Sequence, residues 1–377
     1  MIYLDNNATT KLAPEAREAM LPFLDEEYGN PSSAYALGGR AKEAGTTARK
    51  AVCAWLDASM AELVFTSGAT ESNHQAILGA LKLCPEKRHI VTTAAEHTST
   101  LKLSAWLETQ GYRVTRLAVS ANGELYISQL EAAICADTAL VTMMWANNET
   151  GVIFPVEEAA NIAKARGALF HVDAVQALGK LPFSWRQNAI DLLSFSGHKL
   201  HGPKGVGGLL VRKGVDLPPL FFGSQERGRR GSSENVPGIV GMGVAAELLQ
   251  GYSADSSLRD RLEGRVLQAL PKAYVNGVRA PRIANTSNIC FAGLDAEALL
   301  MKLDRAGICV SMGAACQTGG NEPSHVLLAM GLSREQALSS LRFSLSRYST
   351  QQEIDVAADQ IVAAVKSFAP SPTAVLA

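Results

Sequence analysis

Between residues 60 and 211, short apolar runs alternate with segments of helical periodicity. The first run, 62–66, leads into an amphipathic segment that starts near Glu71, and the second, 89–93, leads into one around residues 101–107. The run at 138–146 is continuously apolar, as expected of a strand covered on both faces. Further strands are predicted at 168–173, 191–196 and 207–211. Strands that alternate with helices predict an α/β fold with a mostly parallel sheet.

The rhythm changes at residues 214–238, which are rich in Gly, Pro and Arg and show no clear period. A loop of this length inside a compact domain is usually functional or lies at an interface. A helix is predicted directly after it, and a second α+β unit follows, with short strands at 285–291, 308–310 and 341–345. The length of 377 residues also favours two domains, since a single core usually stops growing at about 250–300 residues.

Composition narrows the class of protein. A formal charge of −1 gives no reason to expect nucleic acid as a partner. The start of the chain lacks the features of an export signal, and no apolar run reaches the ~20 residues of a membrane helix, so we expect a cytoplasmic protein with no membrane partner. The cysteines form no CxxC pair and are expected to be reduced thiols: Cys53, Cys84, Cys135, Cys290, Cys309 and Cys316.

Polar groups follow several of the predicted strands, where an open α/β sheet binds its ligands. In TSGATES (66–72), Gly68 allows close approach of a ligand, and Thr70 is expected to cap the helix that begins near Glu71. Exposed N–H groups and the helix dipole make such a turn an anion site. A capped helix without any ligand explains this stretch equally well.

Asp173 closes one predicted strand, and Lys199 follows the next, one strand–helix–strand unit later. An acid at this place is commonly a helix cap, and a lysine is commonly a surface residue. Consecutive strands are often neighbours, however. An acid and a lysine facing a phosphate-binding turn fit pyridoxal phosphate, which uses a lysine and a partner for its ring nitrogen. Burial near that cationic ring is expected to lower the pKa of Lys199, which suits covalent and proton-transfer chemistry.

Other polar residues lie at comparable positions. His97 could stack on the ring, although a lone histidine is more often structural. Asn148 and Gln176 could donate to the phenolate oxygen of the cofactor. Ser196 and His198 flank the lysine and could contact the phosphate of the cofactor. Each residue is weak evidence by itself. Their order along the chain makes the combination specific.

These motifs closely resemble the cysteine desulfurases of the NifS/IscS type, within the class V aminotransferase group of fold-type I pyridoxal phosphate enzymes. The matching motifs run in the family's order from residue 3 to about 350: YLDNNATT, GNPSS, TSGATES, EH, NNETG, HVDAVQALGK, SFSGHKLHGPKGVG, QERGRRGSSEN, EPSHVL and RFSLSRYST. The resemblance implies a large domain over 14–250 with a mostly parallel seven-stranded sheet. It also implies a smaller α+β domain over 1–13 and 251–377 that carries the catalytic cysteine loop.

The resemblance also assigns roles to individual residues. It implies a covalent link to pyridoxal phosphate at Lys199, Asp173 on the ring nitrogen, and His97 stacked over the ring. The remaining cofactor contacts that it implies are Asn148 and Gln176 on the phenolate oxygen, and Gly68, Ala69, Thr70, Ser196 and His198 at the phosphate. Ser233 would reach the phosphate of the partner subunit in a homodimer. Arg342 and Asn30 would bind the substrate, with the guanidinium on its carboxylate.

Cys316 lies in a glycine-rich segment, VSMGAACQTGGNEPSH. A free cysteine is usually a small buried hydrophobe, but these glycines favour a loop. The resemblance implies that L-cysteine is converted to L-alanine while Cys316 takes the sulfur as a persulfide and passes it to an acceptor, such as an iron–sulfur scaffold. Cys316 would then also be a transient iron–sulfur ligand.

Several readings of the activity stay open at this stage. A selenocysteine lyase would share nearly every motif, a class V aminotransferase would have no use for Cys316, and a non-catalytic sulfur carrier would have no use for Lys199. The sequence does not name the sulfur acceptor. Nitrogenase maturation, general cluster assembly and thiolation are equally compatible with it.

Overall fold

The computed structural model describes residues 1–312 and 322–368. Its largest sheet has seven strands in the order β2-β8-β7-β6-β5-β3-β4. Strand β8 is antiparallel to both of its neighbours, and the other pairs are parallel, so the predicted mostly parallel sheet is confirmed. The strands are β2 (Leu63–Thr66), β3 (His89–Thr93), β4 (Arg113–Leu117), β5 (Thr138–Met144), β6 (Leu169–Asp173), β7 (Leu192–Ser196) and β8 (Gly207–Val211).

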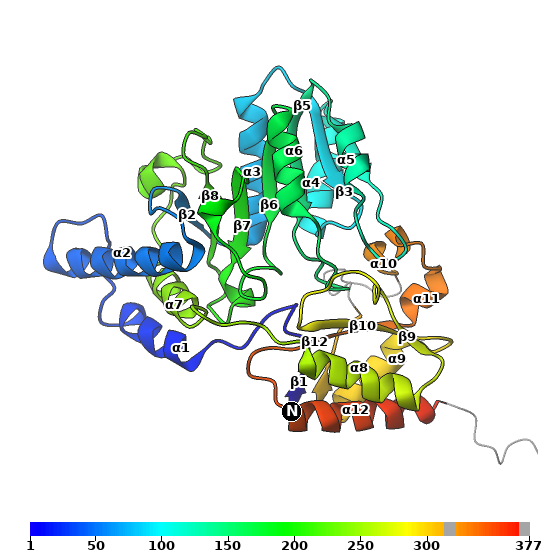
Figure 1. Cartoon of the computed structure of the whole chain (residues 1–377). Helices are drawn as coiled ribbons and strands as arrows, with labels where there is room; N and C mark the ends of the chain where they lie inside the picture. The colour runs from blue at the N-terminus through cyan, green and yellow to red at the C-terminus, as the bar shows by residue number, and fades with distance from the viewer. Residues whose placement is uncertain (313–321, 369–377) are drawn as a thin grey trace, which may run out of the picture.

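Both faces of this sheet are covered, because successive side chains of a strand point to opposite faces. Leu140 and Leu192 belong to an apolar cluster with residues of α3 (Ala69–Leu83) and α4 (Thr98–Thr109). The next residues, Val141 and Leu193, belong to a second cluster that includes residues of α6 (Val156–Ala165) and α5 (Ile127–Ala133). Burial on both faces explains why these strands are apolar at nearly every position. Figure 1 shows this layered upper half of the molecule.

The lower half in Figure 1 holds two smaller sheets. Strands β9 (Ala273–Val275), β10 (Thr286–Phe291) and β12 (Ser340–Ser344) form an antiparallel sheet, and β1 (Ile2–Tyr3) pairs in parallel with β11 (Ile308–Cys309). A separate apolar cluster joins them to α8 (Ser257–Ala269), α9 (Ala296–Arg305) and α12 (Gln351–Lys366). The first strand of the chain thus packs with its last third.

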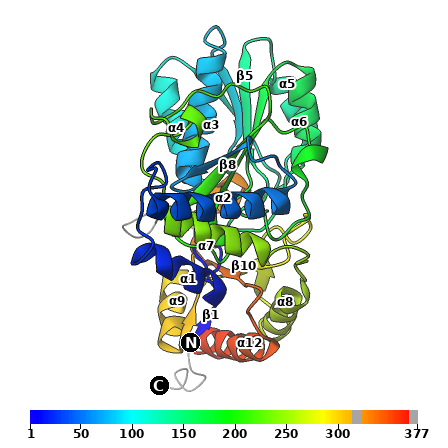
Figure 2. The same ribbon diagram turned by 90° about the vertical axis from the view of Figure 1, so that its left-hand side faces the viewer.

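Helices α1 (Pro14–Met20), α2 (Ala36–Leu56) and α7 (Val236–Glu247) lie together at one side of the molecule, in front in Figure 2. A side chain at Gly243 of α7 would come within 2.6 Å of the Cα atom of Ala48 in α2, so the close approach of these helices requires glycine there. Two short helices, α10 (His325–Ala329) and α11 (Arg334–Leu338), follow the segment outside the described residues. The 3-10 turns are η1 (Leu21–Leu24), η2 (Trp185–Gln187), η3 (Gly197–Lys199) and η4 (Gln225–Gly228).

The sequence pattern found six of the seven strands of the large sheet and missed β4, whose Arg113 and Arg116 are exposed at the sheet edge. It also missed the three-residue strand β9. The stretch 214–238 contains only η4 before α7 begins, in agreement with the expected irregular segment. Within the described residues, no helix combines the length and apolar character needed to cross a membrane. The domain boundaries stay a prediction.

One buried histidine of β6 makes the stability of the fold depend on pH. His171 is fully buried between the hydroxyl groups of Thr142 and Ser194, each 2.8 Å from a ring nitrogen. Burial lowers the pKa of His171 to about 3. As the pH falls below about 6.5, His171 of the unfolded chain binds a proton, whereas His171 of the folded chain stays neutral. The folded state therefore loses stability as the pH falls below about 6.5.

We expect His171 alone to lower the free energy of unfolding by about 2 kcal/mol between pH 7 and pH 5. Urea unfolding of the wild type and of His171→Gln at both pH values measures this effect. Glutamine keeps polar partners for both hydroxyls but does not titrate, so the loss in the variant should be smaller by about that amount. Equal losses in the two proteins would contradict the assignment.

Candidate active site

A cavity of about 630 Å³ lies at the carboxyl ends of the parallel strands. Its walls come from the turns after β2, β3, β5, β6 and β7, from residues 7–9, and from β12 and α10. This is where an open α/β sheet binds its ligands. Most residues predicted from the sequence line it: Gly68, Ala69, Thr70, His97, Asn148, Asp173, Gln176, Ser196, His198, Lys199 and Arg342.

Among the described residues, Ser233 and Asn30 are the predicted residues that do not line it. Ser233 lines a smaller cavity of about 230 Å³ beside Thr66 and Ser67. Asn30 is exposed, and its side-chain oxygen accepts a hydrogen bond from the Ser32 amide at 2.9 Å. Cys316 lies outside the described residues. The roles of these three residues stay predictions.

Lys199 reaches into the cavity from η3, directly after β7. Its Nζ atom donates to the backbone carbonyl oxygens of Asn7 at 2.5 Å and Ala8 at 2.6 Å. Strands β6 and β7 are neighbours, as predicted, with Asp173 paired in register with Ser194. The amine and the carboxylate therefore belong to one wall. The N-terminal segment holds the amine by main-chain oxygens.

Asp173 is the last residue of β6 and is only 6% exposed. One carboxylate oxygen accepts from the side-chain amide of Asn73 at 2.7 Å, and the other accepts from the Val175 N–H at 3.1 Å. Each oxygen can accept a second hydrogen bond. The carboxylate is thus fixed in place by two donors and still able to receive a donor from a ligand in the cavity.

The anion-binding turn is built at the start of α3. The residue that caps this helix is Gly68, and no side chain accepts from the first turn, so the expectation that Thr70 is the cap was wrong. Thr70 lies within the first turn because the helix begins two residues earlier than the sequence pattern indicated. The N–H groups of this turn are left without a side-chain cap, which suits an anionic ligand.

A carboxylate close to this turn is neutralised by a neighbour. Glu71 accepts from the Ser67 N–H at 2.9 Å and forms an ion pair with Arg230, also at 2.9 Å. Burial by itself would raise the pKa of Glu71, but the hydrogen bonds from Arg230 and Ser67 hold it below its usual value. Arg230 thus balances the negative charge that would otherwise oppose an anion.

His97 combines a structural contact with a place in the cavity wall. It caps α4, its Nδ1 atom accepting from the Ser99 N–H at 3.2 Å. Burial lowers the pKa of His97; Asp173 opposes this shift, while Lys199 and His325 add to it. The ring is therefore neutral at pH 7, and its proton lies on Nε2, because Nδ1 accepts.

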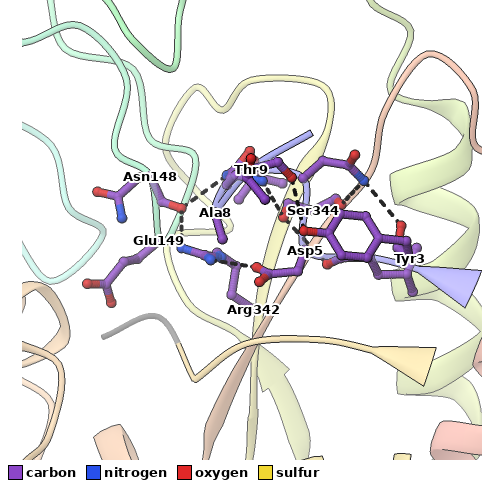
Figure 3. Close-up of polar contacts among 12 residues, drawn as sticks. Tyr3, Asp5, Ala8, Thr9, Asn148, Glu149, Arg342 and Ser344 are labelled. Carbon is purple, nitrogen blue, oxygen red and sulfur yellow. Dashed lines mark hydrogen bonds and ion pairs between the residues drawn. The ribbon is translucent and has the colours of Figure 1, made fainter. Parts of the chain in front are cut away.

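Arg342 of β12 is the most buried cation of the cavity wall, with 2% of its side chain exposed. It forms an ion pair with Asp5 at 2.7 Å and donates to the carbonyl oxygen of Asn148 at 3.1 Å (Figure 3). The Nε atom of Arg342 is buried and has no hydrogen-bond partner among the described residues. The described part of the chain thus leaves one donor of this buried guanidinium unsatisfied.

Several residues of the cavity were not assigned a role from the sequence: Asn7, Ala8, Thr9, Asn73, Glu149, Lys204 and His325. Hydrophobic periodicity does not mark them, because they are polar or small residues of turns, of the N-terminal segment and, for Asn73 and His325, of the helices α3 and α10. The available signal for the first three was the polar run in YLDNNATT. Glu149 is fully buried, which raises the pKa of its carboxyl, and it accepts from Ser324 at 2.5 Å.

Comparison with known proteins identifies the class. A family model described as aminotransferase class-V matches residues 2–356, and the chain belongs to this family. A curated relative from Trichormus azollae, named cysteine desulfurase, is 52% identical over 94% of this chain and 90% of its own. The predicted resemblance to cysteine desulfurases is confirmed by relatives of this kind.

Solved structures agree with the fold. One titled NifS-like protein superposes with a TM-score of 0.89 at 36% identity, over 97% of this chain and 99% of its own. Another, titled SspA in complex with cysteine, has a TM-score of 0.83 at 35% identity, over 93% of this chain and 100% of its own. The predicted α/β fold of the fold-type I enzymes is therefore confirmed.

The ion pair between Asp5 and Arg342 predicts a large loss of stability in Asp5→Ala. Removing one partner leaves the buried guanidinium uncompensated, which should lower the free energy of unfolding by about 3 kcal/mol. Glu18→Ala, which breaks the exposed pair with Arg17, should change it little. Urea unfolding of the three proteins tests this. Similar small losses in both variants would contradict the importance of the buried pair.

Proposed function

We propose that the protein is a pyridoxal phosphate-dependent cysteine desulfurase, which converts L-cysteine to L-alanine and leaves the sulfur on Cys316 as a persulfide. One observation carries this proposal: Lys199, Asp173 and the uncapped start of α3 line a single cavity together with Arg342. An amine, a buried acid, an anion site and a carboxylate site are the groups that this cofactor and an amino acid require.

The donor set fits the cofactor. The first turn of α3, with Ser196 and His198, would hold the phosphate, and Asp173 would accept a hydrogen bond from the protonated ring nitrogen. The neutral ring of His97 would stack on the cofactor. Asn148 and Gln176 would donate to its phenolate oxygen.

When bound, pyridoxal phosphate supplies an electron sink for the charge that develops at the substrate Cα. The residues of the chain do the rest. Arg342 would hold the carboxylate of cysteine through its guanidinium, and Lys199 would carry the covalent link and then move the Cα proton. Asp173 would keep the proton on the ring nitrogen.

The sulfur transfer would fall to Cys316. Its thiolate attacks the substrate sulfur, the bond between Cβ and sulfur breaks, and the carbon fragment takes a proton at Cβ and leaves as alanine. The sulfur stays on Cys316 for transfer to an acceptor protein such as an iron–sulfur scaffold, in which step Cys316 would transiently contact the cluster. We also propose a homodimer, in which Ser233 reaches the partner's phosphate site and Asn30 contributes to substrate binding.

The first test concerns Lys199. The purified protein should be yellow, and borohydride should fix the cofactor on the peptide that contains Lys199. Lys199→Ala should lose this link, because no amine remains to form it. A borohydride-reducible cofactor bond that persists in the variant would show that the residue is wrongly assigned.

The second test concerns Cys316 and separates the desulfurase from its alternatives. Serine keeps the size of the side chain, but its hydroxyl attacks sulfur far less readily than a thiolate. Cys316→Ser should bind the cofactor, and cysteine should still change the absorption spectrum of the bound cofactor. The variant should release alanine at least about 100-fold more slowly, because it has lost its activated nucleophile. Alanine release and the visible spectrum are measured in parallel.

The wild type, treated with cysteine in the absence of a reductant, should gain the mass of one sulfur atom on the peptide of Cys316. Sulfur that maps instead to another cysteine, or a serine variant that turns over normally, would refute the mechanism. If Cys316→Ser loses activity on cysteine but keeps it on selenocysteine, the selenocysteine lyase alternative is favoured. Amino transfer to a keto acid without sulfur release would favour the aminotransferase.

A further inference from the structure

Lys180 lies behind the cavity wall, four residues after Gln176 in the turn that follows β6. Its Nζ atom donates to the side-chain oxygen of Gln176 at 2.6 Å and to that of Asn7 at 3.2 Å. Lys180 as a whole is half-buried, but the two side chains that it contacts are only 4% and 2% exposed. Gln176 and Asn7 line the large cavity, while Lys180 lines a smaller one of about 60 Å³ next to it.

This contact fixes the orientation of the Gln176 amide. An ammonium group has three donors and no acceptor, so the atom of Gln176 that faces Lys180 must be the oxygen. The amide nitrogen points the other way and donates one hydrogen to the carbonyl oxygen of Asn7 at 3.0 Å. One N–H of Gln176 remains. Toward a ligand in the cavity, Gln176 can therefore act only as a donor.

The charge of Lys180 is not balanced by a nearby acid. Over residues 1–312 and 322–368, no carboxylate forms an ion pair with it. Burial, helped by the positive charges of Lys199 and Arg342, lowers the pKa of Lys180 to about 7. The charge of Lys180 contributes to lowering the pKa of His201, and His201 lines the same small cavity as Lys180, together with Asp255 and Arg347.

A buried cation without a counterion is costly unless an anionic or accepting group completes its surroundings. In this protein, a ligand in the large cavity can supply that group. An oxygen with negative charge that accepts from Gln176 would strengthen the hydrogen bond between Gln176 and Lys180, because linked hydrogen bonds polarise one another. The same oxygen would be attracted by the ammonium itself.

We propose that Lys180 is a positioning residue, which holds Gln176 as a donor to an anionic oxygen in the cavity and so favours the deprotonated form of the covalent link at Lys199. The inference rests on the proposed function, in which that oxygen is the phenolate of pyridoxal phosphate. Lys180 does not touch the cofactor in this arrangement. It acts through the Gln176 amide.

The test is a spectroscopic pH titration of the cofactor-loaded protein, because the visible band reports the proton on the link at Lys199. In Lys180→Met, the midpoint of this titration should rise by about one pH unit, since a cation has been removed and the Gln176 donor is no longer held in its orientation. Lys180→Arg keeps the charge and the donors and should restore a midpoint close to that of the wild type.

The matched control is Lys87→Met. Lys87 is also half-buried and donates to two oxygens, the carbonyls of Thr138 and Gly167, but lies outside the cavity wall. This control should leave the midpoint unchanged. Lys180→Gln serves as a second neutral variant if Lys180→Met does not fold. A wild-type midpoint in a neutral variant that retains the cofactor would overturn the proposal.

A double-mutant cycle tests whether Lys180 acts through Gln176. In Gln176→Ala, replacing Lys180 by methionine should shift the midpoint by less than half of its effect in the wild type, because coupled residues are not additive. Equal shifts in the two backgrounds would overturn the positioning role. A protein without any Lys199-dependent visible band would instead overturn the proposed function, and the Lys199→Ala experiment detects this before Lys180 is changed.

Discussion

The arrangement of the cavity depends on Asn7, a buried side chain near the start of the chain. Its side-chain nitrogen donates to the carbonyl oxygen of Asn148 and to Thr286, and its backbone nitrogen donates to Ser344. Its backbone oxygen accepts hydrogen bonds from Lys199 and from the Gln176 amide. Its side-chain oxygen accepts from Lys180 and Asn285. One residue thus ties the strand ends of the large sheet to the small antiparallel sheet.

Asn7 can hold these segments in place because the strands around it are rigid. Strands β5, β6 and β7 are buried on both faces, so their carboxyl ends cannot shift without disturbing two apolar clusters. Polar groups at those ends are therefore held in fixed positions. Glu96 adds to it: its carboxyl accepts from Thr93 and from the Met144 N–H, which joins β3 to β5, and burial raises its pKa to about 8.

The sequence was informative wherever burial and strand ends dictate residue type. Apolar runs located six strands of the large sheet, and the polar residues at or just after their ends, such as Asp173 and Lys199, do meet in one cavity. The pattern failed at β4, because an exposed edge strand carries the polar residues of a surface. It gave the wrong cap for α3, since a glycine can cap a helix without a side-chain signal. The contacts of Asn7 join segments far apart in the chain, which no local pattern encodes.

The pairing of β1 with β11, and of Asn7 with Ser344, has a consequence for synthesis on the ribosome. The first residues of the chain emerge long before their partners, so they must wait without a fixed structure until the last third has been made. Domains otherwise tend to fold from the N-terminus as they emerge. Contacts of such large sequence separation form late, because the loop entropy must be overcome first. The large sheet can therefore assemble early in translation, whereas the wall around Lys199 closes only after the strands that contain Ile308 and Ser344 have been made.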